Sequence, residues 1–435
     1  MKSTIKVLKG KFTENSYIKN VVVLMFGSGI SQLIPFAISV VLSRLYTSEE
    51  FGVFTLFSSI VSFLAVISTM RYEVAIMLPK RNIEAFHLVV LSLIISLFVS
   101  VTVLISTLLF PISISELLSS QNIKPWLFLL GISVFLVGGV QTFTIWFNRR
   151  KKYKIISSTM VSQSATTATI NTINGFSGLT SGGLIIGGIS GQFIAFVNYA
   201  RLFFKYYSRL FKYFSWQRLW NIAKEYSDYP KFSFPHRLVD MISITGLPLI
   251  IAFLFTEAIL GWYGFMLRVL KAPLGILAAS LGQVYFQQLS EQVAQRKSVK
   301  SLFRKTVLRI AVIILPFFIV ILIWGPDIFA FVFSEKWRQA GVYAQYLTPW
   351  LLVSSITSPV SQTPLSLGYV KLNMIAGIIG NLLIVSIFIV FAKVFDNIES
   401  VFLIIGIVMP VFYLLLLLWY NAIINKYERD TKLKS

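Results

Sequence analysis

Long apolar runs recur along the whole chain, and each is about as long as a helix that crosses a bilayer. A transmembrane helix needs ~20 predominantly apolar residues. Twelve such runs can be read, at residues 20–43, 51–70, 86–110, 125–147, 155–173, 182–204, 238–256, 258–286, 307–324, 345–367, 372–394 and 400–424. The runs do not alternate between apolar and polar residues, as the ~10-residue strands of a membrane barrel would. The sequence therefore predicts an all-α polytopic membrane protein with about twelve transmembrane helices.

The basic residues predict how these helices are oriented. Thirty-two of the 39 Lys and Arg residues fall in the two terminal segments and in alternate connecting segments, whereas only five fall in the other connections. Because basic segments stay in the cytoplasm, both termini are expected there. The same placement explains the net charge of +22 without a nucleic-acid partner. The expected parts are a tail at 1–19, an N-lobe at 20–204, a linker at 205–237, a C-lobe at 238–424 and a tail at 425–435.

The linker contains a short amphipathic pattern. Its apolar residues Trp216, Leu219, Trp220 and Ala223 recur at helical spacing, and charged residues occupy the other faces. This pattern predicts an interfacial helix that lies on the inner leaflet. Two roles remain open for it, a hinge between the lobes and a simple tethered connector.

The two halves of the chain share a local pattern. In each half a mid-span proline, Pro35 or Pro248, precedes a short outer turn with Ser/Thr and Glu, and then a glycine and an aromatic residue open the next helix. Six helices per half give both halves the same orientation, so we expect two six-helix lobes related by a pseudo-two-fold axis along the membrane normal. Substrate sites in such proteins tend to lie between the halves.

The run 258–286 carries Arg268 and Lys271 near its middle. Residues three apart lie on one face of a helix. A charge at mid-bilayer costs about 2.5–3.5 kcal/mol on insertion scales, so this pair is expected to face protein or water. The first interpretation is a clasp for phosphate, since Arg binds phosphate in a bidentate manner and Lys acts as a point charge. The alternative is an ion pair with a membrane acid such as Asp240, which is also a candidate to carry a coupling proton.

Two of the predicted helices are unusually polar. The helix 155–173 and the helix 345–367 carry many hydroxyl and amide side chains, among them Gln163 and Gln362. Such residues suit the wall of a watery cavity that handles sugar hydroxyls, and Gln163 and Gln362 are candidate substrate ligands. Interhelical hydrogen bonds, worth ~0.6 kcal/mol each, are the alternative.

Arg71 and Glu73 end the second predicted helix on the inner side. Arg71 is a candidate substrate ligand, and Glu73 is a candidate for ion coupling or ion pairing. The simpler interpretation, which we favour without further evidence, is a charge pair anchored at the membrane–water interface, and such an exposed pair stabilises a protein by about 0–1 kcal/mol.

Several classes of chemistry lack the residues that they need. The chain has no Cys and only two isolated His, at 87 and 236, which argues against disulfides, thiol chemistry and a metal site. It has no phosphate-loop signature of an ATP motor. The connecting segments are too short for a separate catalytic domain, so we expect a transporter without catalytic residues.

Three segments resemble one family of transporters. R-L-Y-T-S-E-E-F-G-V-F (44–54), R-Y-E-V-A-I-M-L-P (71–79) and Y-P-K-F-S-F-P (229–235) are similar to the bacterial polysaccharide repeat-unit flippases of the Wzx type. That family belongs to the multidrug/oligosaccharidyl-lipid/polysaccharide (MOP) exporter superfamily. The resemblance runs nearly end to end and implies a MATE-like, two-lobed fold in the bacterial inner membrane.

The resemblance also implies a function. The substrate would be undecaprenyl-pyrophosphate-linked oligosaccharide for O-antigen or capsule synthesis, moved by alternating access through a cationic lumen that Arg268 and Lys271 fit. It implies no cofactor, a cycle coupled to an ion gradient with H⁺ and Na⁺ both open, and as partners membrane lipids, a polysaccharide polymerase and a chain-length regulator. The rival interpretations are a drug/cation antiporter of the same superfamily, which would prefer an acidic cavity, and a membrane polysaccharide polymerase or ligase, which would need a larger outer loop.

Overall fold

The computed structural model describes residues 2–395 and 397–432, and within them the chain is helical and contains no strand. Each predicted run falls on one long helix. In chain order the long helices are α1 (Lys2–Leu45), α2 (Ser48–Ser68), α4 (Asn82–Leu109), α6 (Leu129–Arg149), α7 (Tyr153–Phe176), α8 (Ser181–Tyr207), α10 (Phe234–Leu254), α11 (Glu257–Ala294), α12 (Lys300–Phe333), α13 (Arg338–Val360), α15 (Val370–Phe395) and α16 (Ile398–Lys432). The prediction of an all-α polytopic protein is confirmed. The largest difference is at α1, which begins far earlier than the predicted run. α12 ends nine residues after its predicted run, and α13 ends seven residues before its own.

Most of the long helices are apolar enough for a bilayer. By length and composition, eight helices in the described part of the chain could cross a membrane, namely α1 from Phe26 onward, α2, α4, α6, α8, α12, α15 and α16. The four others include α7 and α13, the two helices that the sequence predicts to be polar. The chain is therefore a multi-pass membrane protein in which polar helices stand beside apolar ones.

The helices form two compact units. Unit 1 takes the chain up to Tyr46 and then Val53–Thr245, and unit 2 takes Thr47–Gly52 and the chain from Gly246 onward. The border on the C-terminal side therefore lies within α10. The first turn of α2 belongs to unit 2, although the rest of that helix belongs to unit 1.

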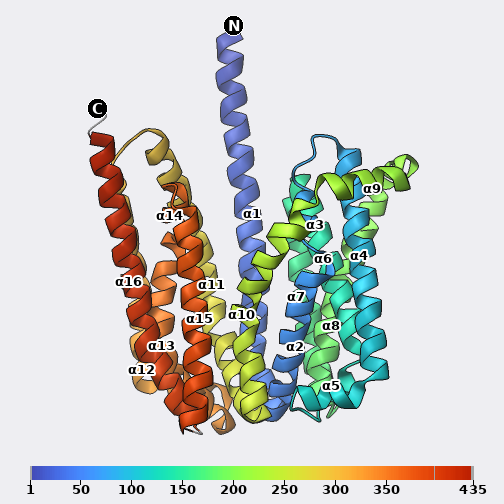
Figure 1. Ribbon diagram of the computed structural model, residues 1–435, viewed down its shortest axis with the longest axis vertical. Helices are drawn as coiled ribbons and strands as arrows, with labels where there is room; N and C mark the ends of the chain where they lie inside the picture. The colour runs from blue at the N-terminus through green and yellow to red at the C-terminus, as the bar shows by residue number, and fades with distance from the viewer. Residues whose placement is uncertain (1, 396, 433–435) are drawn as a thin grey trace. The chain divides into compact units, whose positions relative to one another are not determined.

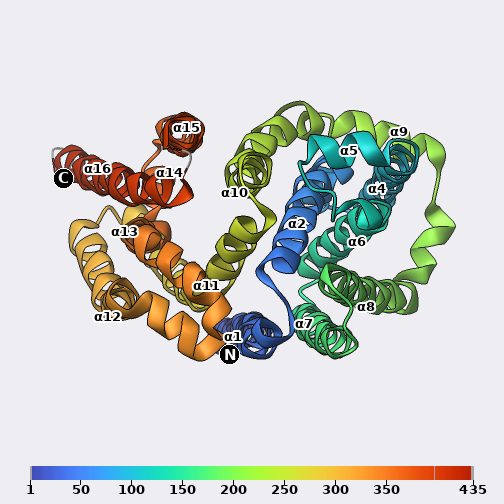
Figure 2. The ribbon, with the colours of Figure 1, turned by 90° about the horizontal axis from the view of Figure 1, so that it is seen from below.

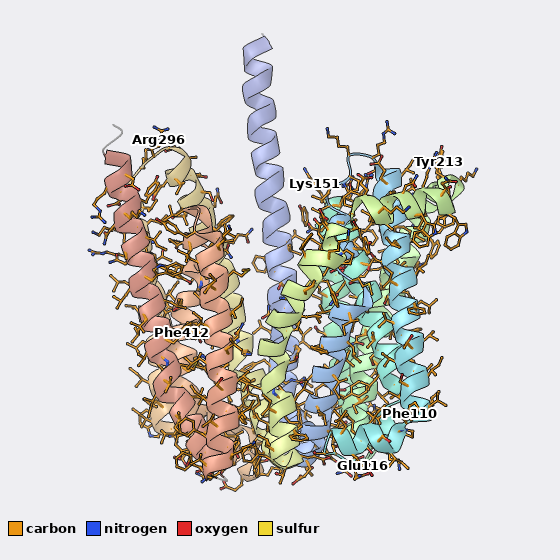
Figure 3. All side chains as sticks on the ribbon, viewed as in Figure 1. Phe110, Glu116, Lys151, Tyr213, Arg296 and Phe412 are labelled. Atoms are coloured by element: carbon orange, nitrogen blue, oxygen red, sulfur yellow. The ribbon has the colours of Figure 1, made fainter. Side chains whose placement is uncertain are left out.

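Unit 1 is a bundle whose helices run side by side (Figure 1). α7 packs between α1 and α8, and α4 packs along α6. Lys151 and Tyr213 mark one end of this bundle, and Phe110 and Glu116 mark the other (Figure 3). The short helices α3 (Tyr72–Ala75) and α9 (Trp216–Glu225) lie at the first end, and α5 (Pro111–Leu117) lies at the second (Figure 1).

The predicted amphipathic helix forms as α9, but its apolar residues divide between two environments. Leu219 and Ile222 are buried, and α9 packs on α4, whereas Trp216 and Trp220 are 63% and 68% exposed. Burial raises the pKa of Tyr72, so its hydroxyl stays protonated and donates to the carbonyl oxygen of Ala223 at 2.9 Å. Thus α9 is fixed to the end of unit 1 and presents its tryptophans outward.

Unit 2 is built around α13. This helix packs against α11, α12 and α16, and α15 packs on α16 (Figure 2). α12 and α13 approach closely at Gly325 and Gly341, where a Cβ on Gly341 would overlap the carbonyl of Gly325. Arg296 lies at one end of this unit, and Phe412 lies midway along it (Figure 3).

The two related motifs of the sequence meet inside unit 2. A Cβ added at Gly52 would overlap the carbonyl oxygen of Glu257, and a Cβ added at Gly261 would overlap the carbonyl oxygen of Ser48. The first turns of α2 and α11 therefore cross in backbone contact, and each glycine makes the equivalent contact to the other turn. Beside the crossing, Phe51 meets a stacked pair, Phe265 and Trp337, whose ring centroids are 3.9 Å apart.

This crossing predicts a stability effect. Gly261→Ala should destabilise the protein by about 1–3 kcal/mol, because the new methyl group meets backbone that cannot move aside. The matched control is Gly377→Ala on α15, where nothing lies within 4 Å of the added Cβ. The control should leave the melting temperature in detergent unchanged or raise it, since Ala is the better helix former. Equal melting temperatures for the two variants would contradict the crossing.

Candidate functional site

The best candidate site is a cavity of about 460 Å³ inside unit 2. It lies among α11, α13 and α16. Its walls are Lys271, Leu274 and Gly275 of α11, Leu351, Ser354, Ser355, Thr357 and Ser358 of α13, Ser361 just beyond α13, and Tyr413, Leu416 and Tyr420 of α16. One cation, a group of hydroxyls and two phenol rings therefore share one space.

α11 supplies the cationic side of the site. The helix begins after Thr256, whose hydroxyl accepts a hydrogen bond from the backbone N–H of Ile259, and an N-cap of this kind fixes where the turns start. Lys271 lines the cavity and is exposed, and Arg268 lies one turn earlier and is half-buried. Neither side chain makes a hydrogen bond or an ion pair with any residue that the structure describes.

α13 supplies the hydroxyl side of the site. The hydroxyl residues of this helix were predicted to line a cavity, and the structure places Ser354, Ser355, Thr357 and Ser358 in the cavity walls beside α11. The helix ends at Val360, directly after Pro359, and the short helix α14 (Thr363–Ser366) follows. Tyr285 of α11 and Thr363 hold this break with a buried hydrogen bond of 2.6 Å. Gln362 is exposed and lies outside the cavity walls, so its role as a ligand stays a prediction.

The tyrosines of α16 are lining residues that the sequence interpretation missed. Tyr413, Leu416 and Tyr420 recur three and four residues apart, which places them on one helix face. That spacing was the available signal, but it does not separate a cavity wall from an ordinary packing face. Aromatic rings with hydroxyls nearby are common in sites that orient a small ligand.

The candidates Arg71 and Glu73 lie in unit 1, at the turn between α2 and α3. Arg71 adopts a left-handed backbone conformation with φ of 67°, and its guanidinium contacts the Glu73 carboxylate at 3.2 Å. Glu73 is only 4% exposed. This geometry agrees with a structural charge pair that holds the turn, and the binding and coupling roles of the two residues stay predictions.

Most of the polar residues of α7 that make described contacts serve helix packing. Asn171 and Thr167 lie against Gly187 and Gly191 of α8, and Asn198 of α8 donates to Ser162 at 3.2 Å. The backbone of Gln163 faces Gly191, and its side chain lines neither cavity described for the two units. The contacts of Ser162, Thr167 and Asn171 agree with the interhelical interpretation, and the role of Gln163 as a substrate ligand stays a prediction.

The remaining candidate, Asp240, belongs to α10, and its side chain lies outside the described part of the structure. Among the residues described, no group of three His, Asp or Glu side chains lies close enough to hold a metal ion.

Comparisons with known proteins agree with this architecture. The family described as polysaccharide biosynthesis protein matches residues 41–341, more than two thirds of the chain. No curated protein matches the sequence significantly. The lipid II flippase MurJ, solved in an inward closed conformation, is 15% identical, with a TM-score of 0.71 over 95% of this chain and 91% of that chain.

Two transporters of the MOP superfamily have similar structures. An inward-facing multidrug resistance MATE family transporter is 17% identical, with a TM-score of 0.62 over 93% of this chain and 94% of that chain. A transporter from Pyrococcus furiosus, whose binding pocket has reverse polarity, is 16% identical, with a TM-score of 0.60 over 94% of this chain and 96% of that chain. At these identities the matches establish the fold, and the MATE-like fold expected from the sequence is confirmed.

Arg149 and Lys271 have different surroundings, so we expect replacement of each by glutamine to affect the stability of the protein differently. Arg149 donates to the carbonyl oxygens of Ile76 and Met77, at 3.1 and 3.0 Å, and also to that of Pro79. Arg149→Gln should therefore destabilise the protein by about 1–3 kcal/mol, since these carbonyls lose their donor. Lys271→Gln should leave the melting temperature unchanged or raise it, because no described partner is lost. A Lys271→Gln variant that melts as early as Arg149→Gln would show that Lys271 is structural.

Proposed function

Because the chain belongs to the polysaccharide biosynthesis protein family and has the MOP-superfamily fold, we propose that it is a flippase for lipid-linked oligosaccharide. The substrate would be a repeat unit of a surface polysaccharide, such as O-antigen or capsule, attached to undecaprenyl pyrophosphate. The protein would move it from the cytoplasmic to the outer leaflet of the bacterial inner membrane. One protein with this fold is a lipid II flippase, which supports a lipid-borne cargo.

The observation that carries the proposal is Lys271, which has no partner among the described residues, in a cavity of hydroxyls and tyrosines. A charged side chain without a partner raises the free energy of a protein within the membrane, and binding of an anion to that side chain lowers it again. Lys271 and Arg268, one turn apart, would contact the pyrophosphate, with Arg able to bind two phosphate oxygens at once. The serines of α13 and the rings of Tyr413 and Tyr420 would contact the first sugar.

The charge of the cavity distinguishes this function from drug export. A cavity for cationic drugs would carry an acidic side chain, and none of the described residues that line the cavity in unit 2 is acidic. The polymerase or ligase alternative would require an activated nucleophile, and the described lining offers hydroxyls and a lysine but no carboxylate or histidine to activate one. An anionic substrate fits the lining better than a cationic drug.

The membrane potential bears on the direction of transport. An inside-negative potential favours outward movement of an anion by about 2.3 kcal/mol per charge per 100 mV. The same potential would oppose the return of an empty cationic carrier, so we propose alternating access coupled to H⁺ or Na⁺. Glu73 and Asp240 are the acids that we propose as coupling candidates. A polysaccharide polymerase and its chain-length regulator would use the product on the far side.

Flipping can be measured in proteoliposomes that contain undecaprenyl-pyrophosphate oligosaccharide, by following the exposure of the sugar to an impermeant lectin. Arg268→Ala and Lys271→Ala should each slow flipping by tenfold or more, since a hydrogen bond to a charged group is worth about 1.5–3 kcal/mol. The control is Lys393→Ala, which removes an exposed cation at the end of α15 and should flip at the wild-type rate. Wild-type rates in both cavity variants would overturn the site. Protein that elongates the glycan without moving it would favour the polymerase alternative.

A further inference from the structure

Unit 1 contains a cavity of its own, of about 140 Å³, among α2, α6 and α8. Its walls are Phe54, Phe57, Ser58, Val61 and Ser62 of α2, Ser133 and Val137 of α6, and Ile185, Gly188, Ile189 and Gln192 of α8. Ser62 is exposed and Ser58 is half-buried, so the cavity opens beside the polar face of α2. None of its wall residues is a site candidate from the sequence.

Two buried polar atoms of this cavity have no partner. The hydroxyl of Ser133, a residue that is 0% exposed, and the amide oxygen of Gln192 make no hydrogen bond with any described group. Some buried hydroxyls of unit 1 donate to a carbonyl of their own helix, as Ser59 does to Thr55 and Thr142 does to Gly138, both at 2.8 Å. The hydroxyls of Thr69, Ser92, Ser96 and Ser100 are buried without a described partner, as that of Ser133 is. A buried polar group left unpaired costs about 1–3 kcal/mol. Ser133 and Gln192 differ from these residues because both belong to the walls of one cavity, where a polar occupant would be close enough to pair with them after a small side-chain movement.

The lining defines the chemistry of that occupant. No charged side chain is among the described residues of the walls, so neither a phosphate nor a metal ion would be compensated by them. Ser58, Ser62 and Ser133 can each donate and accept a hydrogen bond, and the Gln192 amide can do both as well. The other walls are the rings of Phe54 and Phe57 and aliphatic side chains. Neutral hydrogen-bonding groups beside aromatic rings suit a ligand with hydroxyls on its edge and C–H groups on its face.

The volume agrees with a ligand of one ring. A single water needs about 10–15 Å³ of such space. The 140 Å³ of this cavity therefore accommodates about ten water-sized groups, roughly one pyranose ring with its hydroxyls. We propose that this cavity is a binding site for one uncharged sugar ring of the translocated oligosaccharide, a proposal that rests on the proposed function.

The test uses the full-length protein in nanodiscs and a probe without phosphate or lipid. The probe is the free oligosaccharide released from the lipid-linked repeat units of the host, and its binding is followed by saturation-transfer NMR. Ser133→Ala and Gln192→Leu should each weaken binding about tenfold, because each removes one hydrogen bond to a sugar hydroxyl. The matched control is Ser59→Ala, which removes a hydroxyl that is already bonded within α2 and lies outside the cavity walls. It should bind as the wild type does.

Thermal melting without oligosaccharide separates lost binding from lost structure. Ser133→Ala should melt at the wild-type temperature or above it, since it removes an unpaired buried hydroxyl. Unchanged affinity in both cavity variants would overturn the proposal. So would a lower melting temperature for Ser133→Ala, which would show that the hydroxyl belongs to a structural water network. Flipping of the lipid-linked oligosaccharide by the wild-type protein is measured separately in proteoliposomes, so failure of the sugar site and failure of the flippase assignment give different results.

Discussion

An unpaired cation within a membrane protein is the constraint on which this account depends. Lys271 and Arg268 have no described partner, and a charge at mid-bilayer is costly. The structure meets this constraint locally, because Lys271 lines a cavity whose walls include the serine-rich part of α13. Polar walls lower the free-energy cost of the charge on Lys271, and in the proposed function an anionic substrate would lower it further. The polar helix α13 and the basic residues of α11 therefore depend on each other, because the hydroxyls of α13 surround the space that Lys271 lines.

The polar side chains of α7 and α13 have different structural roles, although the two helices have similar compositions. α7 uses amides and hydroxyls against the glycines of α8, at Gly187 and Gly191, where small residues let the backbones approach. α13 turns its serines toward a cavity and ends at Pro359 and Val360. Side-chain polarity alone does not distinguish packing from lining. The neighbouring helices decide the role of the polar side chains. α8 places glycines against α7, whereas α11 contributes a lysine and α16 contributes two tyrosines to the cavity beside α13.

The sequence predicted the long helices well, because hydropathy over ~20 residues reflects a bilayer directly. It also selected Lys271 and the serines at 354–358, since charge and hydroxyls stand out within apolar runs. It did not select Tyr413, Ser133 or Gln192, whose significance comes only from what surrounds them. It grouped Leu219 with Trp216 and Trp220 on one apolar face of α9, whereas packing on α4 buries the leucine and leaves the tryptophans exposed.

The most direct test of the central claim is equilibrium binding of undecaprenyl-pyrophosphate oligosaccharide to the purified protein, compared between Lys271→Arg and Lys271→Gln across a range of salt concentrations. If the positive charge at this position holds the pyrophosphate, the arginine variant will bind nearly as well as the wild type, and binding by both will weaken as salt rises. The glutamine variant will bind at least tenfold more weakly, with a shallower dependence on salt. Equal affinity and equal salt dependence in the two variants would contradict the claim that the cavity of unit 2 is the anion site.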